Sequence, residues 1–114
     1  MTYRIEISPT AIADIEKIFL WYRDYSVDEA HRWVRGCYEM MLKLEKFPNR
    51  CSLARESPYL NLPIRQLLYQ KQYRVLFAVR TAEPENIVQI HRVLRASQAR
   101  LDKTEQLFGK SEEE

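Results

Sequence analysis

The chain has 114 residues and a mass of 13.7 kDa, a length that fits one compact domain with one hydrophobic core. Its net charge of +2 and its 30% of charged residues are ordinary for a globular protein, so bulk charge alone does not indicate nucleic-acid binding. No stretch approaches the ~20 apolar residues of a membrane-spanning helix, and the N-terminus lacks the apolar segment of a signal peptide. We therefore expect a cytoplasmic protein, with one domain over residues 1–110 and a frayed acidic tail at 111–114.

The two cysteines indicate neither a disulfide framework nor a metal site. Cys37 falls in a helical pattern and Cys51 in a loop, and neither has a histidine or another cysteine nearby at metal-ligand spacing. We therefore expect two free thiols, and we expect neither a metal nor a cofactor.

The N-terminal part predicts a strand followed by a helix. Apolar and polar residues alternate from Tyr3 to Ser8, which is the period of a strand with one buried face. Ser8 and Pro9 form a helix-start signal, because the serine oxygen can accept a hydrogen bond from a free N–H and proline fits the first helical position. The helix should run to about Asp24. Trp21 lies off its apolar stripe, which makes this residue a candidate for a partner interface.

A second helix is predicted to complete a hairpin with the first. Ser26 and Glu29 have the Ser-x-x-Glu spacing of a capping box, and Pro48 should end the helix. Gly36 lies in its middle, where glycine costs about 1 kcal/mol relative to alanine unless another group approaches closely. We therefore expect the two helices to cross at Gly36.

Three strands should follow a proline-rich loop at residues 48–63. They lie between Ile64 and Arg95, with a tight turn at Lys71–Gln72 and a longer turn at Thr81–Asn86. In the middle strand, the core face should consist of four alternating residues: Tyr73, Val75, Phe77 and Val79. In the last strand, the half-exposed set should be Ile87, Gln89, His91, Val93 and Arg95.

The order strand, helix, helix and three strands predicts an α+β fold. We expect a small, mostly antiparallel four-stranded sheet in the order β-α-α-β-β-β, with the helical hairpin on one face and no evident cover on the other. A short helix from about Ser97 to Phe108, ending at Gly109, should follow the sheet.

Positive charge is concentrated on the three-strand segment. It holds only two acidic residues, Glu83 and Glu85, so its net charge is +4 and the rest of the chain sums to −2. Its six basic residues are Arg65, Lys71, Arg74, Arg80, Arg92 and Arg95. The uncovered face of the sheet is therefore predicted to be a shallow basic surface and the functional site.

Several short motifs, in this order and spacing, resemble the RelE/ParE superfamily of bacterial type II toxin–antitoxin toxins, ParE-like members more than RelE-like ones. The motifs are Ser8-Pro9-Thr10-Ala11 with Asp14-Ile15, Leu44-x-x-Phe47-Pro48, Ile64-Arg65-x-Leu67, Tyr73-Arg74-Val75-x-Phe77 and Arg92-Val93-Leu94-Arg95. The resemblance implies a toxin that a cognate antitoxin neutralises by wrapping a disordered segment around it. It leaves two actions open, because ParE-like members inhibit DNA gyrase and RelE-like members cleave messenger RNA in the ribosome.

The ribonuclease alternative needs cations for the phosphate and a pair of groups that take and give protons. Arg74 matches the Tyr-Arg motif of active RelE-like toxins and would hold the phosphate, with Arg65 and Arg95 assisting. His91 is the candidate for proton transfer, but it has no second titratable partner. The usual tyrosine or histidine beyond the last strand is missing, since the chain has neither after His91. His91 by itself is more typical of a half-buried strand residue.

We therefore favour a ParE-like toxin that acts by protein contact. Its partner- or phosphate-binding residues should be Arg65, Arg74, Arg92 and Arg95, and its antitoxin should be acidic where it crosses Arg65, Arg74 and Arg95. Any one of these arginines could instead pair internally with an acidic residue. A degenerate family member retained as a binding module is the third interpretation.

Overall fold

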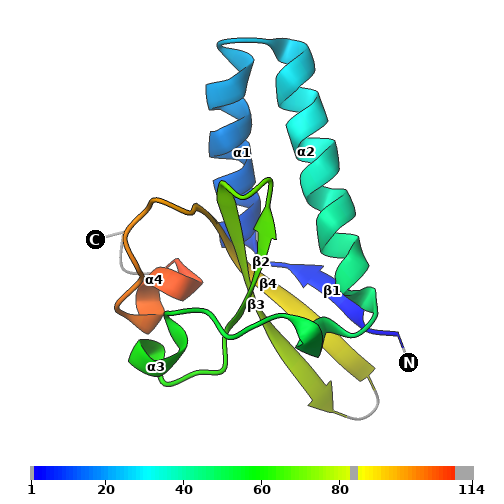
Figure 1. Ribbon diagram of the computed structural model, residues 1–114, viewed down its shortest axis with the longest axis vertical. Helices are drawn as coiled ribbons and strands as arrows, with labels where there is room; N and C mark the ends of the chain where they lie inside the picture. Colours follow the sequence, from blue (N-terminus) through cyan, green and yellow to red (C-terminus); the bar gives the residue numbers. More distant parts are fainter. Residues whose placement is uncertain (1, 83–84, 110–114) are drawn as a thin grey trace.

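Four strands form the central sheet of the protein. A computed structural model of the chain describes residues 2–82 and 85–109 (Figure 1). The strand order is β1-β4-β3-β2, in which β1 runs parallel to β4 and the other neighbours are antiparallel. The strands are β1 (Arg4–Ile7), β2 (Arg65–Tyr69), β3 (Tyr73–Ala82) and β4 (Glu85–Arg95). The predicted α+β class and element order are confirmed.

A hairpin of two long helices, α1 (Pro9–Arg23) and α2 (Val27–Leu42), packs on one face of the sheet and extends beyond the β2–β3 turn (Figure 1). Both predicted caps are present, since the Ser8 side chain accepts from the Ala11 N–H and the Ser26 side chain from the Glu29 N–H. No helix within residues 2–82 and 85–109 is long and apolar enough to cross a membrane.

The end of the second helix was predicted too late. α2 stops at Leu42, and two 3₁₀ segments follow it, η1 (Lys43–Glu45) and η2 (Pro48–Arg50). Phe47 separates them with a φ of 52°, a left-handed conformation that is uncommon for a bulky residue. These tighter turns bury Leu44 and Pro48.

The hairpin and the sheet enclose the larger of two hydrophobic cores. The β3 face predicted to be internal is in this core, with Tyr73, Val75 and Phe77 almost fully buried. Cys37 and Cys51 are both buried and free, as predicted, and burial raises the pKa of the Cys37 thiol to about 12. The helices contribute Ala11, Ile15, Ile18, Trp33, Cys37 and Met41 to this core.

The prediction that the opposite face of the sheet lies uncovered was wrong. The short helices α3 (Ser57–Leu60) and α4 (Thr104–Phe108) lie on that side (Figure 1) and close a second core. Its buried members are Ala54, Leu60, Ile64, Leu76, Leu94, Leu101 and Leu107. The sequence pattern hid this core because most of its residues come from irregular segments and helices of one turn or so, which are too short to show a period.

The C-terminal helix is shorter than predicted, although it ends as expected. It starts at Thr104 rather than near Ser97, because the chain before it is irregular and delivers Leu101 into the second core. Gly109 ends it in the left-handed region at a φ of 73°. The predicted acidic tail at 111–114 lies outside the described residues.

A bulge in β4 changes which side chains share a face. Phe77 pairs with Ile90 and Leu76 pairs with Arg92, so His91 is an extra residue without a partner in the ladder. The prediction of a half-exposed set was therefore wrong at Val93, which lies beyond the bulge and is 2% exposed in the larger core. It was also wrong at Ile87, before the bulge, which is 6% exposed.

The predicted positions of the β2–β3 turn and of the helix crossing also need correction. The β2–β3 turn is centred on Gln70 and Lys71, at φ of 55° and 61°, rather than on Lys71–Gln72. Gly36 does not mark the crossing of the helices, because a Cβ there would lie 2.2 Å from the Tyr69 hydroxyl of β2. The second predicted turn, Thr81–Asn86, includes residues 83–84, which lie outside the described residues; β3 continues to Ala82 and β4 begins at Glu85.

Candidate functional site

The basic residues of the three-strand segment do not gather on one surface. Two of its arginines, Arg74 and Arg92, are held by buried or half-buried carboxylates, and Arg65 is partly buried against a loop. Arg80 and Arg95 are exposed, each near the C-terminal end of its strand, and because β3 and β4 are antiparallel they lie at opposite ends of the sheet. The structure therefore divides the predicted site residues into internal cations and cations that are free to meet a partner.

Arg74 belongs to the interior. It is 4% exposed and forms a two-pronged ion pair with the completely buried Glu56, with 2.9 Å between Nη1 and Oε1. Gln66 also accepts from its Nη1, and the Leu101 N–H donates to Glu56. Burial alone would raise the pKa of Glu56, but hydrogen bonds and charge from Arg74 and the Leu101 N–H outweigh it and hold the pKa below its usual value.

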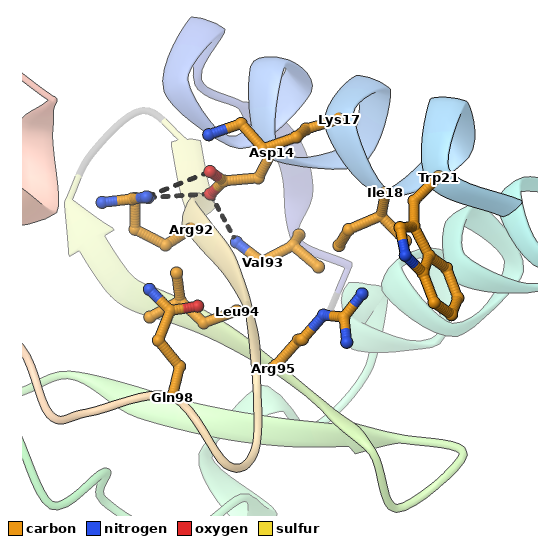
Figure 2. Close-up of a pocket in the computed structure, with 9 residues that line it drawn as sticks. All are labelled: Asp14, Lys17, Ile18, Trp21, Arg92, Val93, Leu94, Arg95 and Gln98. Carbon is orange, nitrogen blue, oxygen red and sulfur yellow. Dashed lines mark hydrogen bonds and ion pairs between the residues drawn. The ribbon is translucent and has the colours of Figure 1, made fainter.

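Arg92 is also engaged, and it joins three elements. Its Nε and Nη2 donate to the Asp14 carboxylate of α1 at 2.7 and 3.0 Å, and Nη1 donates to the Gln106 carbonyl of α4. The Val93 N–H donates to the same carboxylate at 2.9 Å, just past the bulge (Figure 2). Asp14 therefore neutralises Arg92 and fixes α1 against β4.

We expect Asp14→Asn to lower the free energy of unfolding by about 1–2 kcal/mol, because the amide keeps one acceptor oxygen but leaves the Arg92 charge unpaired. Chemical denaturation measures the loss. The control is Glu16→Gln on the exposed side of α1, which should stay within about 0.5 kcal/mol of the parent. Equal losses in the two variants would contradict the role assigned to Asp14.

Arg65 supports the loop that precedes β2. Its Nη1 donates to the Cys51 carbonyl at 2.6 Å, and its backbone forms a bridge with Leu53. The Gln66 N–H donates to the Ser52 carbonyl, so this loop covers part of the outer edge of β2.

Arg95 is the predicted site residue that remains available on the hairpin side of the sheet. Its guanidinium carbon lies 4.7 Å from the ring centroid of Trp21, a cation–π contact between the end of β4 and α1. Trp21 is 43% exposed and packs edge-on against Tyr25, which is 74% exposed. Figure 2 shows the Arg95 guanidinium beside the indole, whereas Arg92 turns away toward Asp14.

Two adjoining cavities meet at Arg95, and together we call them the α1–β4 groove. The first, of about 250 Å³, lies between α1 and the end of β4 and is lined by Asp14, Lys17, Ile18, Trp21, Arg92, Val93, Leu94, Arg95 and Gln98. The second, of about 310 Å³, lies at the β2–β3 turn and is lined by Lys71, Gln72, Tyr73, Arg95, Ala96 and Ser97. The exposed cations of the α1–β4 groove are Lys17, Lys71 and Arg95.

The structure does not bring His91 to this groove. His91 packs edge-on against Phe108 with ring centroids 5.3 Å apart, and it lines a separate cavity that includes Ser8 and Gln89. Burial lowers its pKa below the usual 6.5, so the imidazole is neutral at pH 7. His91 and Arg95 therefore do not form one arrangement around a common point.

Part of the groove had a signal in the sequence. Asp14, Lys17, Ile18 and Trp21 recur at steps of three and four, so they share one side of α1. Trp21 was predicted as a partner contact, but Lys17 was not. Nothing in the sequence pattern indicated Glu56, because it sits in an irregular loop and meets Arg74 only through the tertiary fold.

Comparisons with known proteins agree on one family. The family model for the ParE toxin of the type II toxin–antitoxin system parDE matches residues 5–100. A solved structure described as the chromosomal ParDE TA system from P. aeruginosa aligns with a TM-score of 0.65 at 22% sequence identity. The alignment covers 82% of this chain and 96% of that chain, and it bears on the fold alone. No curated protein matches the sequence significantly.

Proposed function

Since the chain belongs to the ParE toxin family of type II toxin–antitoxin systems, we propose that it stops growth through protein contact, with DNA gyrase as its target, and that a cognate antitoxin neutralises it. The observation that carries this proposal is the internal use of Arg74 and Arg92. Arg74 forms an ion pair with Glu56 and Arg92 forms one with Asp14, so neither guanidinium is free to bind a phosphate.

The alternative, cleavage of messenger RNA, lacks support in the geometry of the groove. The exposed cations of the groove can attract phosphate, but cleavage also needs a group to take a proton and a group to give one. Among the described residues that line the groove there is no histidine, and its one carboxylate, Asp14, is bound to Arg92 and the Val93 N–H. Tyr73 lines it, but burial raises the phenol's pKa further from neutrality.

Induced expression in a bacterial host tests the proposal. We expect growth to stop while messenger RNAs, mapped by primer extension, stay intact and cleaved gyrase–DNA complexes accumulate. His91→Gln should arrest growth as well as the parent does. If His91 were a proton-transfer group, its loss would lower RNA cleavage by about 10²–10⁴-fold and relieve the arrest.

Three results would contradict the proposal in different ways. Messages cut within codons would establish the ribonuclease, and arrest without gyrase–DNA complexes would remove gyrase as the target. Harmless overexpression of a folded chain would favour a binding module without toxicity. A neighbouring reading frame that encodes a small acidic protein supplies the antitoxin test, because its co-expression should restore growth.

A further inference from the structure

The α1–β4 groove carries positive charge that the fold leaves unneutralised. Arg92 is compensated by Asp14, but no carboxylate within residues 2–82 and 85–109 forms an ion pair with Lys17, Lys71 or Arg95. Arg95 belongs to both cavities, and so it stands at the middle of the groove. A partner segment that occupies either cavity of the groove therefore lies next to the Arg95 guanidinium.

The same groove has an apolar floor. Ile18 and Val93 line the first cavity and are each less than 10% exposed, and the indole of Trp21 forms one wall. In Figure 2, Val93 lies between the Asp14–Arg92 pair and Arg95, and Ile18 lies next to Trp21. A side chain that fills this space meets hydrocarbon, whereas its neighbours in the same partner segment meet cations.

Trp21 is arranged to hold Arg95 rather than to receive a base. Nucleic acids without sequence preference are bound by aromatic rings with an open face, on which bases stack. Here the Arg95 guanidinium lies over the indole, and Tyr22 and Tyr25 meet the ring in edge-on contacts. The contact with Trp21 restricts Arg95, and a restricted guanidinium loses less freedom when it binds a carboxylate in a two-pronged geometry.

We propose that the α1–β4 groove is the seat of an acidic segment of the antitoxin, a proposal that rests on the proposed toxin function. One carboxylate of the segment binds Arg95, and an apolar side chain next to it enters the cavity floored by Ile18 and Val93. Further carboxylates meet Lys17 at one end and Lys71 at the other. Arg74 takes no part, although it lies on the neighbouring strand.

Selection from a displayed library of random peptides tests this proposal with purified protein and without any growth assay. We expect the enriched peptides to combine aspartate or glutamate with leucine, isoleucine or phenylalanine. Binding of a labelled copy of the most enriched peptide is then measured by fluorescence anisotropy. Arg95→Glu should weaken this binding roughly tenfold or more, because it places like charges together.

Three matched variants locate the interaction. Arg80→Glu makes the same charge change at the far end of β3 and should alter affinity by no more than about twofold, because distant charges are screened. Arg95→Lys should retain part of the affinity, and Lys17→Glu should weaken binding. Fluorescence emission from Trp21 is a second measure of peptide binding that needs no charge variant. The chain's other tryptophan, Trp33, is 3% exposed, so the change in emission on binding should disappear in Trp21→Phe.

Enrichment of neutral or basic peptides would overturn the proposal, and so would equal losses with Arg95→Glu and Arg80→Glu. Displacement of the acidic peptide by a single-stranded RNA at comparable concentration would assign the groove to RNA instead. The two proposals fail separately. Acidic peptides that bind through Arg95 in a protein that does not arrest growth would leave the groove assignment intact and remove the toxin function.

Discussion

Replacing Arg74 with alanine should lower the free energy of unfolding by about 3–5 kcal/mol. The change leaves the Glu56 carboxylate completely buried, and among the other described residues only the Leu101 N–H then donates to it. An uncompensated buried charge is among the most costly defects in a folded protein. Chemical denaturation followed by circular dichroism measures the loss. The matched control is Arg80→Ala on the same strand, where the exposed side chain should contribute less than about 0.5 kcal/mol.

Replacing both partners separates the cost of the lone charge from the worth of the pair. Arg74→Met combined with Glu56→Leu should recover most of the loss, since apolar replacement of a buried ion pair is often neutral or stabilising. A double variant as unstable as Arg74→Ala would contradict this account.

The same pair predicts how stability depends on pH. The pKa of Glu56 in the folded protein lies below its usual value of 4.5, so its contribution is complete above that value and is lost as pH falls through the folded pKa. Unfolding measured across the acid range should therefore show a steeper decline for the parent than for Glu56→Gln, which has no proton to gain.

These expectations bear on how activity experiments are designed. An Arg74 variant that fails to stop growth would be explained by a damaged fold, whatever the biochemical action of the protein. Arg95 and His91 are the informative positions, because Arg95 is exposed and His91 forms no ion pair with a described residue. Each variant should be shown to unfold at the parent's denaturant midpoint before its effect on growth is interpreted.

Gly36→Ala should lower the free energy of unfolding by about 2–3 kcal/mol, although alanine is the better helix former by about 1 kcal/mol. The new methyl group would lie 2.2 Å from the Tyr69 hydroxyl, which donates to the Trp33 carbonyl at 2.8 Å. Tyr69 is 6% exposed and packs against the Trp33 ring, so it cannot move without disturbing the core. Denaturant titration measures the loss, with Arg35→Ala on the exposed side of α2 as control.

Tyr69→Phe tests the cause. It should itself lower the stability by about 1–1.5 kcal/mol through the lost hydrogen bond. In the phenylalanine background, the added cost of Gly36→Ala should fall below about 1 kcal/mol, because the atom that the methyl group meets is gone. Simple addition of the two losses would show that the hydroxyl is not the obstacle.

Local signals in the sequence predicted the framework well. Ser8 with Pro9 and Ser26 with Glu29 gave the starts of both long helices, and alternation gave the core face of β3. Such features depend on residues close together in the chain, where capping and periodicity act. The predicted toxin family is confirmed by the family model that matches residues 5–100.

The site was harder to predict because long-range partners decide it. Arg74 and Arg95 look alike in the sequence, yet one meets Glu56, eighteen positions away, and the other meets Trp21 across the hairpin. Charge counting put both on one basic surface, since it cannot register a carboxylate delivered by an irregular loop. Trp21 was found for a physical reason, as an aromatic residue off the apolar stripe of its helix.

The bulge at His91 determines which face of the sheet each later residue of β4 occupies. Before His91, even-numbered positions such as Val88 and Ile90 face the helical hairpin, and after it the odd-numbered Val93 and Arg95 do. If β4 continued past Ile90 without the bulge, with His91 paired opposite Leu76, Arg95 would fall on the side of the second core and Leu94 would face the helices. The bulge therefore decides on which side of the sheet the groove is built. A chain that lacked His91 could keep the pairs Phe77–Ile90 and Leu76–Arg92 in a regular strand, and Arg95 would stay on the hairpin side.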